Sequence, residues 1–372
     1  MTISTQRGKG RKPGWAVALA GALALTGCTT GSDDALPSVP SPSPTSETVS
    51  PVPSEASGSL VVHATGLTAP WSIAFTEQDV ALVSERDSGR ILELAGDGTP
   101  REAGVVEGVA ARGEGGLLGI TVHDGRLYAY STGTDGNRIE RFDLTGRPGS
   151  LGLGSGETIL SGLPAAATHN GGRIAFGPDG MLYVTVGDAG DRARAQDIET
   201  LAGKILRLEP DGRVPADNPF PGSPVYSYGH RNPQGLAWDD AGVLYATEFG
   251  QNTWDELNVI EAGGNYGWPM VEGIAGRDGF IDPLQQWSPA EASPSGMAIV
   301  DGRIHIANLR GARLRSIPLE DPATAEELLV GEYGRLRDAV AAPDGSLWVV
   351  TNNTDGRGDP APDDDRILRL VP

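Results

Sequence analysis

The sequence is poor in cysteine and in aromatic residues, and both shortages limit what the protein can be. Cys28 is the only cysteine among 372 residues, so no disulfide can form within the chain and the folded part must be held together by its core. Aromatic residues make up 6% of the chain, whereas glycine occurs 53 times. High glycine with modest charge is typical of an all-β protein with many turns.

Positive charge is also scarce, and arginine supplies nearly all of it. The three lysines are Lys9, Lys12 and Lys204, and the formal net charge is −20. Such a surface repels nucleic acid and anionic lipid, so neither is expected as a main partner. Any site for a small anion must therefore be a local cluster of arginines within an acidic protein.

The N-terminus has the features of an export signal. Basic residues between positions 7 and 12 precede an apolar stretch, Trp15 to Leu25, that is too short to cross a membrane as a stable helix. The following Thr-Gly-Cys28 is similar to a bacterial lipoprotein processing box. We therefore expect a signal peptide at 1–27 and an exported, extracytoplasmic protein that is anchored to the membrane only through a lipid on Cys28. The alternative is an ordinary secretory signal that happens to contain a cysteine.

Residues 28–58 and residues 59–372 differ sharply in composition. The first segment consists mainly of Ser, Pro, Thr and Val with a few acidic residues. Because it cannot bury enough apolar surface to offset the entropy of ordering, we expect a disordered linker. The second segment contains six copies of a unit with an apolar strand, a turn, a second strand and a closing strand. The second strands are expected at 81–84, 126–130, 181–185, 243–247, 303–307 and 346–350.

This repeat predicts the fold class. Six such units with several strands each are typical of an all-β, six-bladed β-propeller with four-stranded antiparallel blades around a central channel. A solenoid would need a shorter and more regular unit. In each blade, the residues before the innermost strand and after the second strand fall on one face, because antiparallel neighbours run in opposite directions.

This placement of residues on one face is clearest in the stretch from Thr168 to Asp191. Two apolar strands are joined at a Pro-Asp-Gly turn. His169 lies before the first strand and Asp188 lies after the second, so we expect the two side chains to be neighbours. A histidine held by a carboxylate is the arrangement that a general base needs.

The other blades bring further polar residues to the same face. Its basic residues include four arginines, at 231, 310, 335 and 337, and the planar guanidinium group suits carboxylates. The geometry therefore predicts an anion site with a base in it, and a polycarboxylate as the ligand.

Several motifs resemble the soluble pyrroloquinoline quinone (PQQ) dependent glucose, aldose and sorbosone dehydrogenases. They are His169-Asn-Gly-Gly-Arg, Gly187-Asp188, Tyr228-Gly-His-Arg-Asn-Pro-Gln-Gly, Gly263-Gly-Asn-Tyr-Gly-Trp-Pro and Arg335-Leu-Arg-Asp. The resemblance runs from about Gly66 to the C-terminus. It implies a six-bladed propeller that oxidises the C1 hydroxyl of an aldose to a lactone, with hydride transfer to the quinone, a sugar substrate and an external electron acceptor.

The resemblance also implies roles for individual residues. His169 is the base, Asp188 orients it, and Arg231 acts with them at the reacting centre. The implied cofactor-binding residues are Glu114, His169, Arg231, Asn232, Arg310, Arg335 and Arg337. The backbone carbonyls of Gly250 and Gln251 are expected to hold a calcium ion, an all-oxygen role that suits calcium.

Four positions depart from the pattern of the glucose enzymes. They are Glu114 in place of glutamine, Arg310 in place of lysine, and Phe249 and Gln251 around the calcium loop. Phe249 removes a polar group near the cofactor, which leaves the substrate and the cofactor affinity open.

Other candidate residues have plainer interpretations. His63, His123 and His305 are expected to be packing or surface residues, and His230 is interpreted as structural rather than functional. Trp254 and Trp287 could stack on a sugar ring or fill gaps between blades. The segment Gly263 to Trp268 is interpreted as a turn that needs glycine rather than as a site.

Two further classes of function stay open at this point. A propeller lactonase or similar hydrolase would use calcium in the channel, but it needs converging side-chain carboxylates and does not explain the arginines. A surface binding module without chemistry explains the linker and the propeller, but not a histidine paired with a carboxylate.

Overall fold

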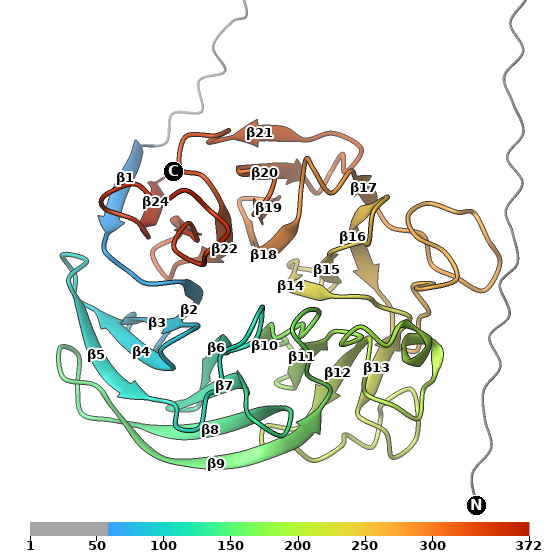
Figure 1. The fold of residues 1–372 in the computed structure, drawn as a ribbon, viewed down its shortest axis with the longest axis horizontal. Coiled ribbons are helices and arrows are strands. Elements are labelled where there is room, and N and C mark those ends of the chain that lie inside the picture. The colour runs from blue at the N-terminus through green and yellow to red at the C-terminus, as the bar shows by residue number, and fades with distance from the viewer. Residues whose placement is uncertain (1–58, 372) are drawn as a thin grey trace, which may run out of the picture. The chain divides into compact units, whose positions relative to one another are not determined.

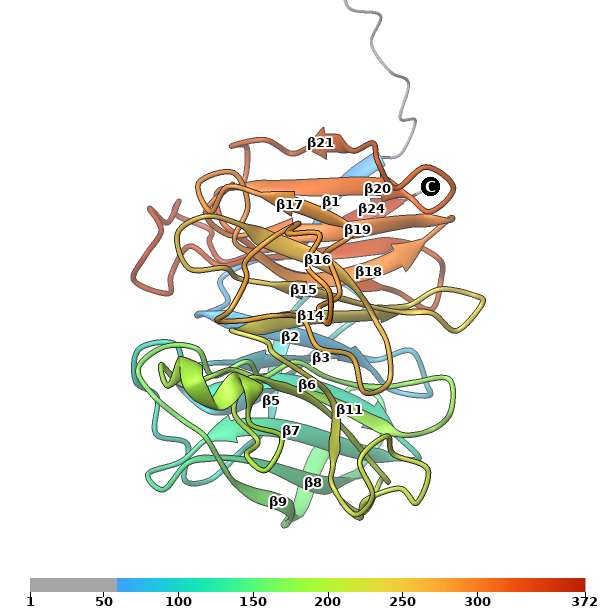
Figure 2. The same ribbon diagram turned by 90° about the vertical axis from the view of Figure 1, so that its right-hand side faces the viewer.

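The computed structural model of the protein describes residues 59–371, so the predicted signal peptide, Cys28 and linker lie outside the described residues. Six four-stranded antiparallel sheets form a ring around a central channel (Figure 1). The predicted all-β, six-bladed propeller is thereby confirmed. In the side view of Figure 2, the short 3₁₀ helix η1 (Arg192–Gln196) lies outside the sheets. Within the described range no helix is long and apolar enough to cross a membrane.

The first three blades follow the chain without crossovers. The first blade consists of β2 (Pro70–Phe75), β3 (Ala81–Glu85), β4 (Arg90–Leu94) and β5 (Pro100–Val105). The second consists of β6 (Leu117–His123), β7 (Arg126–Thr132), β8 (Asn137–Thr145) and β9 (Gly152–Leu163). The third consists of β10 (Ile174–Phe176), β11 (Leu182–Val186), β12 (Lys204–Leu208) and β13 (Val225–Tyr228).

The last three blades have the same order, except that the sixth takes one strand from the other end of the domain. The fourth blade consists of β14 (Pro233–Trp238), β15 (Leu244–Glu248), β16 (Asp255–Ile260) and β17 (Gln285–Trp287). The fifth consists of β18 (Pro294–Val300), β19 (Arg303–Asn308), β20 (Arg313–Pro318) and β21 (Glu326–Leu328). The sixth consists of β22 (Leu336–Ala341), β23 (Leu347–Thr351), β24 (Ile367–Val371) and β1 (Ser59–Ala64).

Strand β1 closes the ring, and the sequence repeat did not reveal it. It pairs antiparallel with β24, so the first described strand completes the last blade. This pairing ties the two ends of the described range together. It also gives the sixth blade the fourth strand that the repeat pattern could not supply from its own unit.

The core lies between adjacent blades rather than in one central cluster. Strand β11 is buried along its whole length because both faces of its sheet pack against a neighbouring sheet. Leu182 and Val184 of β11, for example, belong to the same cluster as Tyr128 and Ile139 of the second blade. Trp287 packs on the guanidinium group of Arg315 at 4.2 Å, which favours the gap-filling role.

A buried ion pair lies in the channel between innermost strands of opposite sides of the ring. Arg173 precedes β10 and donates to Asp338 of β22 at 2.8 Å and to Ser72 of β2 at 2.9 Å. The same guanidinium group lies 4.4 Å from the centre of the Trp71 ring. Removing one partner of such a buried pair costs on the order of 3–5 kcal/mol, so the pair fixes how the blades meet at the channel.

His305 in β19 predicts a specific pH dependence of stability. Burial, helped by Arg303, lowers the pKa of this histidine to about 4. Between pH 6.5 and pH 4 the unfolded chain therefore binds a proton that the folded protein does not, so the free energy of unfolding falls as the pH falls. Relative to His305→Phe, the parent protein should lose on the order of 1–3 kcal/mol over this range. Denaturant unfolding at pH 6.5 and pH 4.5 measures the difference, and parallel pH curves for the two proteins would contradict the assignment.

Candidate active site

A histidine–carboxylate dyad lies where the third blade meets the channel. His169 precedes β10 and Asp188 follows β11, and the antiparallel pairing of these strands brings both to one edge. The Nδ1 atom of His169 and the Oδ1 atom of Asp188 are 2.7 Å apart, as expected from the sequence. The histidine side chain is 19% exposed, whereas the aspartate is 1% exposed. Among the described residues none is hydrogen-bonded to Nε2 of His169, so this nitrogen is open to a ligand.

The environment of Asp188 keeps its carboxylate charged. Burial by itself raises the pKa of this group, but hydrogen bonds from His169, the Gly190 amide and the Trp268 indole outweigh burial and lower the pKa below its usual value. The two other bonds are 2.7 Å from the Gly190 amide and 2.9 Å from Trp268 Nε1. A carboxylate that accepts from Nδ1–H leaves the lone pair of the neutral imidazole on Nε2, which is the tautomer that a base at this position requires.

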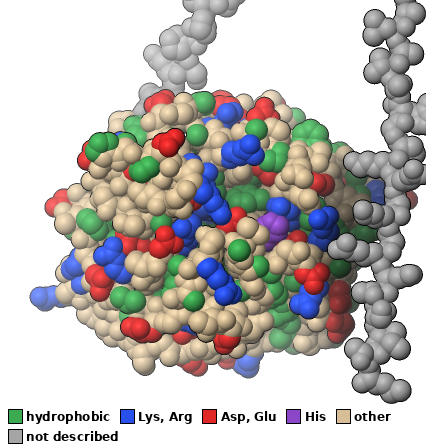
Figure 3. Space-filling view, viewed as in Figure 1, with side chains coloured by type: hydrophobic (Ala, Val, Ile, Leu, Met, Phe, Trp, Pro, Cys, Tyr) green, Lys and Arg blue, Asp and Glu red, His purple; other side chains and the backbone are tan. Residues whose placement is uncertain are grey.

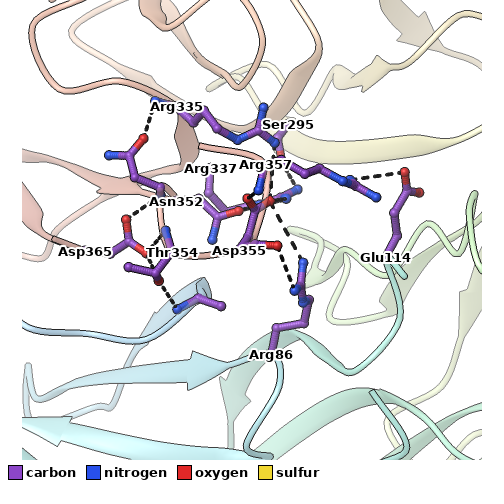
Figure 4. A network of polar contacts seen from close by, with 12 residues as sticks. Arg86, Glu114, Ser295, Arg335, Arg337, Asn352, Thr354, Asp355, Arg357 and Asp365 are labelled. Carbon is purple, nitrogen blue, oxygen red and sulfur yellow. Dashed lines mark hydrogen bonds and ion pairs between the residues drawn. The ribbon is translucent and has the colours of Figure 1, made fainter. Parts of the chain in front are cut away.

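The backbone of His169 is held in an unusual conformation. Its φ angle is 60°, in the left-handed region that a non-glycine residue rarely adopts. The backbone N–H donates to Glu114 Oε2 at 2.8 Å, and the other oxygen of Glu114 lies 3.4 Å from Arg357 (Figure 4). Glu114 therefore reaches from the loop before β6 and fixes the histidine from the second blade.

Arg231 and Asn232 lie beside the dyad, in the segment between β13 and β14. Arg231 Nη1 donates to the carbonyl of Phe249 at 3.1 Å, and its guanidinium group lies 5.5 Å from the centre of the Trp268 ring. Asn232 Oδ1 accepts from the Gly171 amide at 2.9 Å. Two further donors, Arg231 Nε and Asn232 Nδ2, are buried without a hydrogen-bond partner among the described residues. Because an unpaired buried donor is costly, these atoms point to a missing acceptor.

An arginine cluster lies across the channel around one buried carboxylate. Asp355 belongs to the loop between β23 and β24, and its side chain is fully buried. Its Oδ2 atom is 3.3 Å from Arg335, 3.9 Å from Arg337 and 3.9 Å from Arg86 of the first blade (Figure 4). Arg86 is also paired with Asp87 at 2.6 Å, so Arg335 and Arg337 supply the excess of positive charge around Asp355. The space-filling view shows basic side chains and a histidine gathered at the centre of this face (Figure 3).

The arginines of the predicted anion site differ in their burial and in the number of hydrogen bonds that they make within the protein. Arg337 is buried and donates to the side chains of Gln234, Ser295 and Asn352 at 2.9–3.3 Å. Burial, and then repulsion by Arg335 and Arg86, lower its pKa to about 9 despite the nearby Asp355. Arg335 makes one side-chain hydrogen bond, to Asp355, and its Nε atom is buried without a partner among the described residues. Arg310, after β19, is exposed.

The loop after β15 offers backbone oxygens. The Gly250 amide donates to Asp255 at 2.8 Å and the Gln251 amide donates to Glu272 at 2.8 Å. No hydrogen bond of the described residues uses the carbonyl oxygens of Gly250 and Gln251. Within residues 59–371 no group of three or more His, Cys, Asp or Glu side chains is placed to hold a metal. The converging carboxylates that the lactonase alternative needs are therefore not found in this range.

The structure also shows site residues that the sequence did not reveal. Trp268 was interpreted as part of a turn that needs glycine, and Gly263 and Gly267 do have positive φ angles of 76° and 88°. The Trp268 indole, however, also donates to Asp188 and lies beside the Arg231 guanidinium group. Arg86 and Asp355 were not singled out, since their meeting depends on the first and sixth blades being neighbours. The structural interpretation of His230 agrees with its complete burial and its contact with Glu248 at 2.7 Å.

The fold and the site together define a propeller with a histidine–carboxylate dyad beside an arginine cluster, and the comparisons identify its family. The glucose/sorbosone dehydrogenase family model matches residues 67–368. A PQQ-bound aldose sugar dehydrogenase from Streptomyces coelicolor is 51% identical with a TM-score of 0.80, covering 84% of this chain and 98% of its own.

Two further relatives agree with this assignment. A putative glucose dehydrogenase from Thermus thermophilus is 40% identical with a TM-score of 0.77, over 84% of this chain and 100% of its own. An aldose sugar dehydrogenase of Escherichia coli is 29% identical over 77% of this chain and 88% of its own length. The chain belongs to the glucose/sorbosone dehydrogenase family. It is a sugar dehydrogenase, as the sequence predicted.

Arg337 makes more side-chain hydrogen bonds than Arg335, which predicts that their replacements affect stability differently. Arg337→Ala should lower the free energy of unfolding by about 2–4 kcal/mol, because three buried side-chain oxygens lose their donor. Arg335→Ala should cost about 1 kcal/mol or less, because only one long hydrogen bond is lost. Denaturant unfolding of both variants without added ligand tests this difference. Equal losses would show that Arg337 is not a structural part of the channel wall.

Proposed function

We propose that the protein is a PQQ-dependent dehydrogenase that oxidises the C1 hydroxyl of an aldose-type sugar to a lactone. The observation that carries the proposal is the set of buried donors without partners, Arg231 Nε, Asn232 Nδ2 and Arg335 Nε. These three residues are among those that the sequence resemblance assigns to the cofactor. Similarity to the PQQ-bound aldose sugar dehydrogenase of Streptomyces coelicolor supports the choice of ligand and substrate.

The chemistry of the site suits PQQ. This cofactor carries carboxylates and neighbouring quinone oxygens, so it needs cations at one end and neutral or charged donors at the other. Arg310, Arg335 and Arg337 would hold the carboxylates, with Arg337 also forming the wall behind them. Arg231 and Asn232 would donate to the quinone oxygens. Glu114 would act through the backbone of His169 at the edge of this site, according to its 2.8 Å contact.

The chain itself supplies the proton acceptor. When bound, the quinone supplies the oxidising power for removal of hydride from the sugar carbon. Nε2 of His169 takes the proton of the C1 hydroxyl, while Nδ1–H stays donated to Asp188. The charged carboxylate stabilises the imidazolium that forms, and Trp268 keeps the carboxylate oriented.

A calcium ion fits the loop that holds Gly250 and Gln251. Their amides are tied back to Asp255 and Glu272, and their carbonyl oxygens are free of hydrogen bonds from the described residues. Carbonyl oxygens are hard ligands that calcium accepts together with water and carboxylates. We propose these two carbonyls as its ligands from the chain. Phe249 directly precedes Gly250, and its backbone carbonyl accepts a hydrogen bond from Arg231.

Replacement of His169 tests the proposed base. A positioned base contributes about 10²–10⁴-fold to the rate, so His169→Gln should lose turnover by roughly that factor while keeping the fold, PQQ and calcium. Asp188→Asn should lose less, because it misorients the base without removing it. Dye reduction with a panel of sugars gives the rate, and titration with PQQ confirms loading. Aldose oxidation by loaded His169→Gln at the parent rate would assign proton abstraction to another residue.

We also propose that the protein is exported and held at the membrane by a lipid on Cys28. The leader at 1–27 and the Ser- and Pro-rich segment at 28–58 support this domain organisation, with the propeller at 59–372. The linker would let the propeller reach sugars outside the cytoplasm. An external electron acceptor would reoxidise the cofactor after each turnover.

The lipid anchor has a direct test. Cys28→Ser removes the sulfur that carries the lipid and should shift the protein from the membrane fraction to the soluble fraction, with activity per molecule unchanged. Fractionation of cells that express the parent or the variant, followed by an activity assay, measures both quantities. A variant that stays in the membrane fraction would rule out the lipid on Cys28 as the anchor.

A further inference from the structure

A second histidine–carboxylate pair lies behind the site and contacts Arg231 directly. Glu248 is the last residue of β15 and is 5% exposed. Its Oε2 atom is 2.7 Å from Nδ1 of His230, and its Oε1 atom accepts the backbone N–H of Arg231. Nε2 of His230 is in turn 2.9 Å from the hydroxyl of Ser227. One carboxylate thus joins the end of the fourth blade's second strand to the segment that carries the cofactor residues.

The contacts continue from Arg231 to the catalytic dyad. The carbonyl of Arg231 accepts the backbone N–H of Asp188 at 2.8 Å. The carbonyl of the next residue, Asn232, accepts the amide of Phe249 at 3.2 Å. A shift of the Arg231 backbone would therefore move the donors that face the cofactor and also the carboxylate that holds His169. Glu248 is the side chain that fixes this backbone from behind.

The two pairs share one geometry but differ in access. Both have an Nδ1–oxygen distance of 2.7 Å. His169 is open to the channel, whereas His230 is completely buried and stacks on Tyr266, with 4.7 Å between the ring centres. A buried ring with both nitrogens engaged cannot take a proton from a sugar. Its geometry suits the orientation of Glu248.

We propose that Glu248, oriented by His230, is a positioning residue that sets Arg231 and Asp188 relative to the bound cofactor. The inference rests on the proposed function, because it concerns the geometry of the same site. Glu248, at the buried end of β15, would thus contribute to catalysis without contacting the substrate. A purely structural Glu248 would affect stability alone.

Glu256 gives a matched control on the neighbouring strand. It is paired with Glu248 across the β15–β16 ladder and is 7% exposed. Its oxygens accept from the Gly273 amide at 2.7 Å and from Asn258 at 3.1 Å, and neither partner contacts Arg231 or the dyad. Replacing either glutamate by methionine removes a buried carboxyl group that accepts two hydrogen bonds. Burial, and then repulsion by Glu248, raise the pKa of Glu256, so the two replacements differ in their effect on stability, but only Glu248→Met should disturb Arg231.

The test compares kcat in PQQ-loaded, calcium-loaded proteins whose cofactor content is measured. Glu248→Met should lower kcat about 10- to 100-fold, as a small misplacement of reacting groups does, and should shift the absorption band of bound PQQ. The sugar KM should change less than kcat. Glu256→Met should keep the parent kcat and spectrum once loaded.

Glu248→Gln is the conservative variant that should rescue most of the loss. Its oxygen can still accept the Arg231 N–H, and its amide can donate to His230 if the ring changes tautomer and donates from Nε2 to Ser227. Its kcat should therefore stay within about fivefold of the parent. His230→Phe keeps the ring on Tyr266 but removes the donor, so kcat should fall in the same direction as for Glu248→Met. It provides a second test if Glu248→Met does not fold.

Three outcomes would overturn the proposal. The first is a kcat equal to that of the parent protein in both loaded Glu248→Met and loaded His230→Phe. The second is a loss of kcat in Glu256→Met equal to that in Glu248→Met. The third is a loss of kcat in Glu248→Gln as large as that in Glu248→Met. If the parent protein itself neither binds PQQ nor oxidises sugars, the proposed function fails instead, so the two failures are distinguishable.

Discussion

The antiparallel pairing of each innermost strand with the second strand of its blade is the constraint on which the site depends. It carries the residue before one strand and the residue after the other to the same face, and it does so in all six blades. His169 and Asp188 meet through this pairing within the third blade. The arginines meet because β1 closes the ring on β24, which makes the sixth and first blades neighbours. Without closure, Arg86 and Asp355 would lie at opposite ends of an open array.

Sequence patterns predicted what depends on local periodicity and on topology within one blade. The six repeats gave the propeller, and the ends of β10 and β11 gave the dyad. Contacts between blades were harder to foresee, because no periodicity records them. Trp268 reaches Asp188 from a loop eighty positions further along the chain, a contact that no local pattern predicts. Strand β1 carries no copy of the repeat. The roles of the candidate residues, the leader and the linker stay predictions.

At this site an excess of positive charge lies beside buried hydrogen-bond donors that have no partner among the described residues. The chain has a net charge of −20, yet three guanidinium groups surround a single buried carboxylate at the channel. Beside them, donors on Arg231, Asn232 and Arg335 are buried without partners among the described residues. Such an arrangement is expensive in an empty protein, and an anionic ligand with several acceptor oxygens relieves it. Stability and cofactor affinity are therefore coupled at this face.

A crystal structure of the protein with PQQ tests the central claim most directly, namely that these unpartnered donors belong to a cofactor site beside His169. The account predicts PQQ at the channel mouth, with its oxygens within hydrogen-bond distance of Arg231 Nε, Asn232 Nδ2 and Arg335 Nε. It further predicts that Nε2 of His169 faces the space left for the sugar. PQQ bound elsewhere, or bound with those three donors still unpaired, would contradict it.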